Sequence, residues 1–338
     1  MEEYDQVNLT RIALGFNPAL PVNEVVKIAV KAEAAGYESI WMHESLFQRD
    51  IVSYLSLILN VTKSLKAASG VINTHTRHPV VAATTFATLS ELSNGRAIMG
   101  LGLGSFPTIP KIGMRIFPVK ENRPVQRVRE YVELVRALWS GENVNYHGDF
   151  FRAENLQLGF KIPQKIPIYI AGMSPDLLEL AGKVGDGALL SPALATVETT
   201  QRMSSSVKAG ETSSNRKVDK ASYLLTSVDP DENKARETMK SFYFFLFQLS
   251  EVIKPADLEP YGITAEQLVP LKAAWKKGDI MGAKSTVPNQ AIEALTLTGT
   301  KQAVQRHLED YLSAGVDLPI LMPIGNVEYA ISALSPKN

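Results

Sequence analysis

Residues 70–78 combine glycine with uncharged polar side chains directly after an apolar run, a pattern that suits a ligand site. Glycine allows the backbone at Gly70 and Val71 to approach a ligand closely. Asn73 and Thr74 carry donors and acceptors without charge, as hydrogen bonding to the edge of a heterocycle requires. We therefore predict that Gly70, Val71 and Asn73 contact a planar ring.

Two titratable side chains lie close to such loops and could act on a substrate. Glu44 follows the apolar run 39–42, and its carboxylate could orient a substrate or handle a proton, or could simply be a cap or a solvated residue. His75 is the second candidate. His75 and His78 stand three residues apart, but no carboxylate has the spacing of a metal ligand, so we predict no metal site. The chain has no Gly-x-Ser-x-Gly elbow, Walker loop or His-Glu-x-x-His motif.

A second glycine-rich loop spans residues 100–104 and ends in Gly102-Leu103-Gly104. It resembles a dinucleotide fingerprint only superficially, because Pro107 and Pro110 precede any helix and no acidic residue closes a short βαβ unit. We expect Gly102 and Gly104 to clear space beside the bound ring.

Residues 172–175, Gly-Met-Ser-Pro, open directly onto a helix. Free backbone N–H groups at a helix start bind anions, which predicts a phosphate site at Gly172, Met173 and Ser174. An ordinary N-cap by Ser174, with proline in the first turn, explains the same pattern and is compatible with it. Ser191 belongs to the neighbouring loop and would complete the site.

Strand and helix patterns alternate along the whole chain, which predicts a parallel α/β fold. Eight short apolar runs read as buried parallel strands: 11–16, 39–42, 66–72, 97–103, 167–171, 187–190, 220–228 and 317–322. Helical patterns follow them: 22–35, 52–62, 79–93, 125–139, 175–184, 197–209, 291–297, 301–314 and 327–334. Eight such units favour a closed TIM (β/α)8 barrel over an open doubly wound sheet. In a barrel the functional groups follow the strands.

Three segments depart from the alternation. Residues 143–152 are typical of a β-hairpin. Residues 231–289 form a mostly helical insertion after strand seven, broken by prolines, and its aromatic run 242–247 is expected in the core or at a subunit interface, or as a lid over an aromatic substrate. Residues 204–215 are polar and are expected to form a surface loop. We interpret residues 1–338 as one domain.

The composition limits the classes of partner that we expect for this protein. Of 338 residues 45% are apolar, and 35 Lys and Arg balance 35 Asp and Glu, which gives no electrostatic reason to expect nucleic acid or an anionic membrane. The chain has no cysteine, an acidic start unlike a signal peptide and no apolar run of membrane-spanning length. These features favour a cytoplasmic protein that acts on a small molecule.

Several motifs together resemble the luciferase-like flavin and deazaflavin oxidoreductases. They are Ala35-Gly36-Tyr37-Glu38-Ser39-Ile40-Trp41, Arg77-His78-Pro79, residues 89–96, Gly185-Asp186-Gly187-Ala188 and the hairpin through residues 146–151. The stretches 275–279, 297–300 and 314–325 are similar to methylenetetrahydromethanopterin reductase and its relatives within that family. The resemblance spans nearly the whole chain.

The resemblance implies a barrel that binds coenzyme F420, or alternatively FMN, at the carboxyl ends of its strands. It implies a cis peptide between Gly70 and Val71, with the resulting bulge supporting the ring. It also implies a homo-oligomer, a dimer or tetramer, formed through helices on one side of the barrel. The cofactor phosphate would meet Gly172, Met173, Ser174 and the loop near Ser191.

Two positions depart from the pattern of the family. The reductase subgroup has a catalytic Glu near the end of strand one, where this chain has Gly15. Deazaflavin enzymes commonly carry Asp-His after strand two, where this chain has Glu44-Ser45. Both departures argue against methylenetetrahydromethanopterin as the substrate.

Three functions are therefore open at the level of sequence. We favour an F420-dependent oxidoreductase that transfers a hydride to or from a small organic substrate. An FMN-dependent monooxygenase of the same fold is the alternative, and a non-catalytic cofactor-binding protein is the third.

Overall fold

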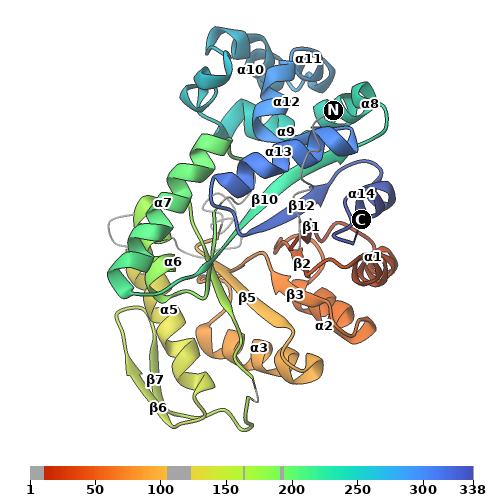
Figure 1. Cartoon of the computed structure of the whole chain (residues 1–338). Helices are drawn as coiled ribbons and strands as arrows, with labels where there is room; N and C mark the ends of the chain where they lie inside the picture. The colour runs from red at the N-terminus through yellow and green to blue at the C-terminus, as the bar shows by residue number, and fades with distance from the viewer. Residues whose placement is uncertain (1–10, 105–122, 163, 191–193, 338) are drawn as a thin grey trace.

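Eight parallel strands close into a barrel in the computed structural model, which describes residues 11–104, 123–162, 164–190 and 194–337 (Figure 1). Neighbours pair in the order β1-β2-β3-β5-β8-β9-β10-β12, and β12 pairs with β1 to complete the ring. The closure confirms the predicted TIM barrel and excludes an open sheet. The barrel strands are β1 (Ala13–Phe16), β2 (Ser39–Met42), β3 (Lys66–Ser69), β5 (Ala97–Gly102), β8 (Ile168–Ala171), β9 (Gly187–Leu189), β10 (Asp219–Val228) and β12 (Leu318–Pro323).

Helices surround the barrel close to the positions that the sequence predicts. Gly36 ends α1 in the left-handed conformation, and Pro79 and Pro175 occupy the first turns of α3 and α6. The predicted loop at 204–215 is wrong, because α7 continues to Ser214. The helices are α1 (Val22–Ala35), α2 (Ile51–Val61), α3 (Pro79–Ser93), α5 (Pro124–Trp139), α6 (Pro175–Val184), α7 (Val197–Ser214), α13 (Lys301–Ser313) and α14 (Val327–Ala333).

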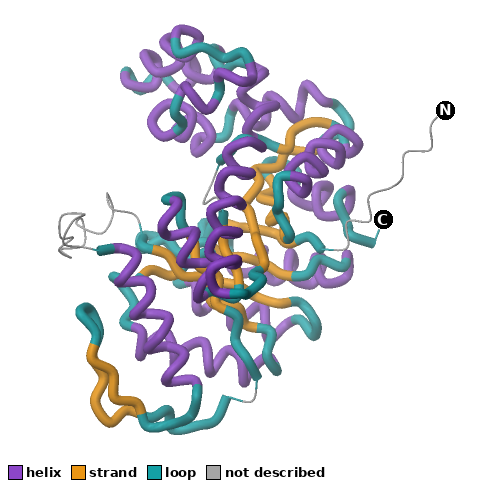
Figure 2. The backbone as a smooth tube through the Cα atoms, turned by 60° about the vertical axis from the view of Figure 1, so that its left-hand side comes forward, coloured by secondary structure: helices purple, strands orange, loops and turns teal. Residues whose placement is uncertain are grey.

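Additional elements decorate the barrel. The predicted hairpin forms from β6 (Val144–His147) and β7 (Arg152–Leu156), and Figure 2 shows it standing apart from the barrel strands. Strand β4 (Ile72–Asn73) pairs with β5, and β11 (Leu297–Gly299), which the sequence analysis did not predict, pairs with β10. The insertion after β10 contains α8 (Glu232–Lys240), α9 (Tyr243–Phe247), α10 (Val269–Lys276), α11 (Ile280–Ser285) and α12 (Asn289–Leu295), with short π and 3-10 turns after α9.

Alternation along each strand divides the apolar residues into two clusters. Ile40 and Met42 of β2 face the surrounding helices, whereas Trp41 between them faces the barrel interior and contacts the Tyr169 ring edge-on at 5.1 Å. Phe245 of the insertion is fully buried in the same cluster as Trp41. The insertion and the barrel interior thus share one apolar cluster.

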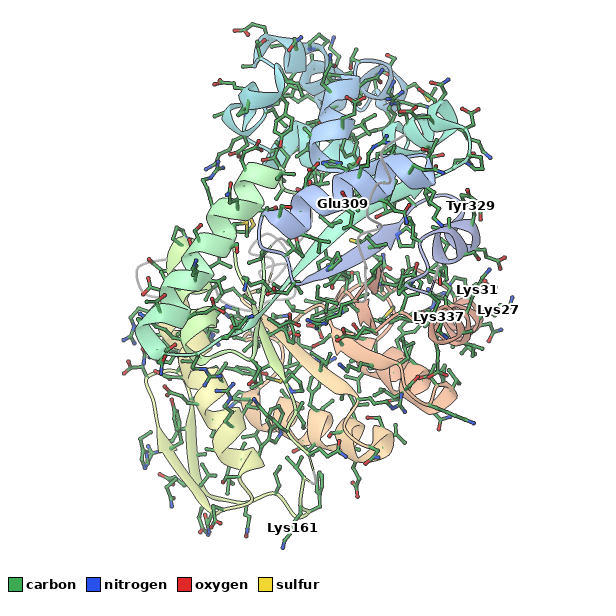
Figure 3. All side chains as sticks on the ribbon, viewed as in Figure 1. Lys27, Lys31, Lys161, Glu309, Tyr329 and Lys337 are labelled. Carbon is green, nitrogen blue, oxygen red and sulfur yellow. The ribbon has the colours of Figure 1, made fainter. Side chains whose placement is uncertain are left out.

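The first and last helices are tied together where the chain ends. Lys31 of α1 forms an ion pair with Glu328 of α14, and Lys337 Nζ donates to the carbonyl of Ala34 at 2.8 Å. Figure 3 shows Lys31, Lys337 and Tyr329 along this edge of the molecule. Within the described ranges, no helix is both long enough and apolar enough to span a membrane.

A charged network lies at the amino-terminal ends of β1, β2 and β10. Arg11 donates to both carboxylate oxygens of Glu38 and to both of Asp219, at 2.7–3.2 Å. Tyr169 also donates to Asp219, at 2.6 Å. Burial acts to raise the pKa of Asp219, but hydrogen bonds from Arg11 and Tyr169 outweigh it and lower that pKa. Burial likewise acts to raise the pKa of Glu38, and hydrogen bonds from Arg11 and Lys66 outweigh it and lower that pKa. This end of the barrel is therefore closed by paired charges.

Replacing Arg11 with Met tests this network. We expect the free energy of unfolding at pH 7 to fall by about 1–2 kcal/mol, because two carboxylates lose charge-assisted hydrogen bonds. The effect is kept small because 41% of the Arg11 side chain is exposed. Glu38 and Asp219 have lowered pKa values, so they stabilise the fold above their unfolded pKa values of about 4 and lose this contribution as the pH falls.

Urea unfolding at pH 7 and pH 3 measures the difference. The difference in unfolding free energy between wild type and Arg11→Met should be smaller at pH 3 than at pH 7. A difference that does not change with pH would contradict the claim that Arg11 stabilises the ionised carboxylates of Glu38 and Asp219. Lys27→Met, which breaks an exposed pair with Glu24, serves as the matched control and should leave stability unchanged.

Candidate active site

The chain leaves the barrel sheet after Ser69 and rejoins it at Ile72, forming a bulge at the carboxyl end of β3. The peptide bond between Gly70 and Val71 is cis, which confirms the sequence-based prediction. Gly70 N–H donates to the carbonyl of Met42 at 2.7 Å, and β4 then pairs with β5. The bulge is held between its neighbouring strands on both sides.

Close packing explains why residue 102 is glycine, independently of the prediction that Gly102 borders a bound ring. A Cβ atom there would lie 2.8 Å from Cγ2 of Val71, so the bulge packs directly against the bare backbone of β5. Gly104 is exposed and has a φ of 85°, which disfavours any residue with a side chain. Whether these glycines also border a cofactor ring stays a prediction.

Glu44 is tied to the loop after β4 and does not stand alone. Its carboxylate accepts from Arg77 Nε at 2.8 Å and from Asn73 Nδ2 at 3.1 Å, and its side chain is only 8% exposed. The Asn73 Oδ1 atom accepts from the backbone N–H groups of His75 and Thr76 at 3.0 and 2.9 Å. Glu44 and Asn73 together therefore fix the course of residues 73–77.

This loop and Arg127 of α5 carry buried polar atoms that have no hydrogen-bond partner among the described residues. Across the described part of the chain, nothing hydrogen-bonds Thr74 Oγ1, His75 Nε2, Thr76 Oγ1 or Arg127 Nε, although all four atoms are buried. Burial, with a smaller contribution from the positive charge of Arg127, lowers the pKa of His75 to about 4. His75 is therefore neutral at pH 7, with one donor and one acceptor nitrogen. Unsatisfied buried polar atoms are costly, and a ligand would satisfy them.

Arg127 connects this loop to the hairpin. One of its amino groups donates to the Thr74 carbonyl at 3.1 Å, and its guanidinium lies 5.2 Å from the ring centres of Phe150 and Phe151. The hairpin turn is held in place by buried Glu130, which accepts from the N–H groups of Asp149 and Phe150. No local motif marks Arg127 in the sequence, because its contacts join segments about 50 and 25 residues away.

The predicted phosphate site begins α6 as an N-cap. Ser174 Oγ accepts from Leu177 N–H at 3.4 Å, which confirms the capping interpretation. Met173 is 65% exposed, and Gly172 N–H donates to the carbonyl of Leu189 at 3.5 Å. Ser191 lies outside the described residues, so its part in the site stays a prediction.

Tyr223 of β10 crosses the barrel interior to the ends of β1 and β3. Its Oη lies 3.4 Å from the Gly70 carbonyl, and a Cβ atom on Gly15 would come within 2.7 Å of its ring. The His43 ring packs edge-on against Tyr223 at 4.5 Å. Neither Tyr223 nor His43 belongs to a local motif that predicts this contact, because only the closed barrel brings β10 opposite β1, β2 and β3.

The contact between Tyr223 and Gly70 can be tested by substitution. In Gly70→Ala the new Cβ would collide with Tyr223 Oη, so we expect a loss of roughly 1–3 kcal/mol in unfolding free energy. Removing the hydroxyl in Gly70→Ala/Tyr223→Phe should restore part of that loss. Urea unfolding of the four proteins in the cycle measures the coupling. Strictly additive effects would show that the two residues do not share this space.

Comparison with known proteins agrees with this architecture. The 5,10-methylenetetrahydromethanopterin reductase of Archaeoglobus fulgidus is 30% identical over 93% of this chain and 94% of its own length. The F420-dependent glucose-6-phosphate dehydrogenase of Amycolatopsis mediterranei is 30% identical over 64% of this chain and 68% of its own. The solved structure of the coenzyme F420 dependent tetrahydromethanopterin reductase from Methanopyrus kandleri superposes with a TM-score of 0.87 at 26% identity, covering 96% of each chain.

The family model for luciferase-like monooxygenases matches residues 7–318, most of the chain. Together with the relatives just described, which include F420-dependent enzymes, this match establishes the family. The protein thus belongs to the luciferase-like oxidoreductases, the family that its sequence motifs resemble.

Proposed function

We propose that the protein is a coenzyme F420-dependent oxidoreductase that moves a hydride between the deazaflavin and a small organic substrate. The observation that carries the proposal is the β3–β4 bulge, which lies beside buried polar atoms that have no partner in the described structure. Full-length similarity to F420-dependent reductases supports the choice of cofactor.

The residues at the strand ends fit such a cofactor. The backbone of Gly70 and Val71 would support the ring, and Gly102 on the adjacent strand lets the Val71 side chain pack closely beneath it. The N–H groups at the start of α6, around Gly172 and Ser174, would bind the phosphate. The bound deazaflavin supplies or accepts the hydride, and the protein contributes orientation and electrostatics.

His75 and Glu44 take different parts in this proposal. His75, neutral and with a free Nε2, would hydrogen-bond the substrate or the ring edge. Glu44 is occupied by Arg77 and Asn73, so it would act as a positioning residue that holds the His75 loop in place. A proton-handling role for Glu44 would require those contacts to open.

An FMN-dependent monooxygenase is the second candidate, because the family model carries that description. Separate titrations with F420 and FMN, followed by fluorescence, distinguish the two. We expect F420 to bind at least about tenfold more tightly, and hydride transfer to be measurable with reduced F420 in the absence of oxygen. Tighter binding of FMN, with oxygen-dependent turnover, would favour the monooxygenase.

Two controls sharpen this experiment. A deazaflavin riboside without the phosphate should bind more weakly than F420, because the α6 site would be empty. The departure at Gly15 predicts little turnover of methylenetetrahydromethanopterin, so a carbonyl compound and a sugar phosphate are tested beside it. Binding without turnover of any substrate would instead support a non-catalytic cofactor-binding protein.

We further propose that the protein forms a homo-oligomer, a dimer or tetramer, through the outer face of α3. Val81 and Leu92 on this face are 54% and 51% exposed, and the threonines between them are uncharged. A groove between α2 and α3 continues the face and is lined by valines, Leu89, Ser56 and the threonines of α3. Exposed apolar faces without charge are typical of subunit interfaces.

A cytoplasmic location stays a prediction.

Light scattering combined with size exclusion tests this interface. Val81→Glu/Leu92→Glu should shift the protein toward a monomer, because two charges would have to be buried in the contact. Met281→Glu, at a side chain 73% exposed on the insertion, is the matched control and should leave the mass unchanged. A monomeric wild type would contradict the proposal.

A further inference from the structure

His43 directly follows β2, and its side chain belongs to the inner face of the barrel. Trp41, two residues earlier, lies in the interior cluster, and its Nε1 donates to Ser39 Oγ at 3.0 Å, so alternate residues of β2 share this face. The His43 ring contacts Tyr223 at 4.5 Å with an interplanar angle of 87°. His43 is therefore at the carboxyl end of the barrel, on the side where functional groups are found.

The Nε2 atom of His43 is buried and makes no hydrogen bond to any residue in the described ranges. Burial also lowers the pKa of His43 to about 4, so the imidazole is neutral at pH 7. A neutral imidazole offers one N–H donor and one acceptor. An unsatisfied buried nitrogen costs free energy, which a ligand with a complementary polar edge would recover.

Tyr223 holds His43 next to the bulge. The Tyr223 ring fills the space that a side chain at Gly15 would need, and its Oη lies 3.4 Å from the Gly70 carbonyl. Tyr223 thus contacts both His43 and the Gly70 carbonyl and links them through its ring and hydroxyl. Glu44, the neighbouring titratable residue, is turned away and paired with Arg77.

We propose that His43 is a cofactor-contacting residue whose Nε2 hydrogen-bonds the polar edge of the redox ring, and that Tyr223 is its positioning residue. The proposal rests on the proposed function, since it requires a deazaflavin or flavin at the bulge. In this proposal the residue at the end of β2 that hydrogen-bonds the ring is His43, which stands one position before the Glu44-Ser45 pair. Tyr223 in turn occupies the volume beside Gly15, where the reductase subgroup has a glutamate.

Imidazole nitrogen NMR of the full-length protein tests the contact directly. The chain has five histidines, and the spectrum of His43→Gln assigns the His43 signals. Saturation with F420, or with FMN if that cofactor binds more tightly, should shift the His43 Nε2 resonance. The signals of His147, exposed on the hairpin, should stay in place.

Affinity provides the second readout. His43→Leu should weaken cofactor binding about tenfold, His43→Gln should recover part of the loss through its amide, and the matched control His147→Leu should bind as wild type does. If the wild type binds cofactor but the Nε2 resonance does not move, the inference is overturned and the proposed function stands. If the wild type binds neither F420 nor FMN, the inference about His43 and the proposed function are both contradicted. A poorly folded His43→Leu leaves the wild-type resonance as the deciding measurement.

Discussion

The site depends on how the backbone is held where β3 breaks off and β4 begins. Ser69 Oγ donates to the Gly100 carbonyl at 2.9 Å and accepts from Gly100 N–H at 2.8 Å, so one buried hydroxyl replaces a pair of strand hydrogen bonds. Because the polar backbone of β5 is satisfied at that point, residues 70 and 71 are free to bulge. The loop that carries Asn73 and His75 starts from this fixed position, and Glu44 and Arg77 then set its course.

The two ends of the barrel use polar groups in opposite ways. At the amino-terminal end, Arg11, Glu38 and Asp219 satisfy one another, and no ligand is needed to complete them. At the carboxyl end, His43 Nε2 and His75 Nε2 stay buried without a partner in the part of the chain that the structure describes. This asymmetry matches the separation of stability and function between the two faces of a (β/α)8 barrel. The buried polar atoms without a partner therefore lie at the end of the barrel where a bound ligand could form the missing hydrogen bonds.

The sequence was sufficient to predict the barrel and the cis peptide at Gly70, but not the contacts that cross the barrel. Short apolar runs and local caps such as Pro79 and Gly36 act within a few residues, so the elements that they bound could be predicted. The predicted loop at 204–215 failed for a local reason, since hydroxyls such as that of Ser205 donate to the carbonyl four residues earlier and tolerate a helix. Arg127 and Tyr223 could not be predicted, because their partners are distant in the chain and only barrel closure brings them near.

The surroundings of Gly15 differ from what the resemblance to the reductase subgroup implies for this position. The fold superposes on that of an F420-dependent reductase along nearly the whole chain, with a TM-score of 0.87. The volume beside Gly15 is filled by the Tyr223 ring, which leaves no room for an additional side chain on β1. A carboxylate at that point could be regained only by moving Tyr223 and, with it, the support of His43 and Gly70. Similarity of fold alone does not reveal the substrate, and the packing around Tyr223 is a feature of this chain on which that choice can depend.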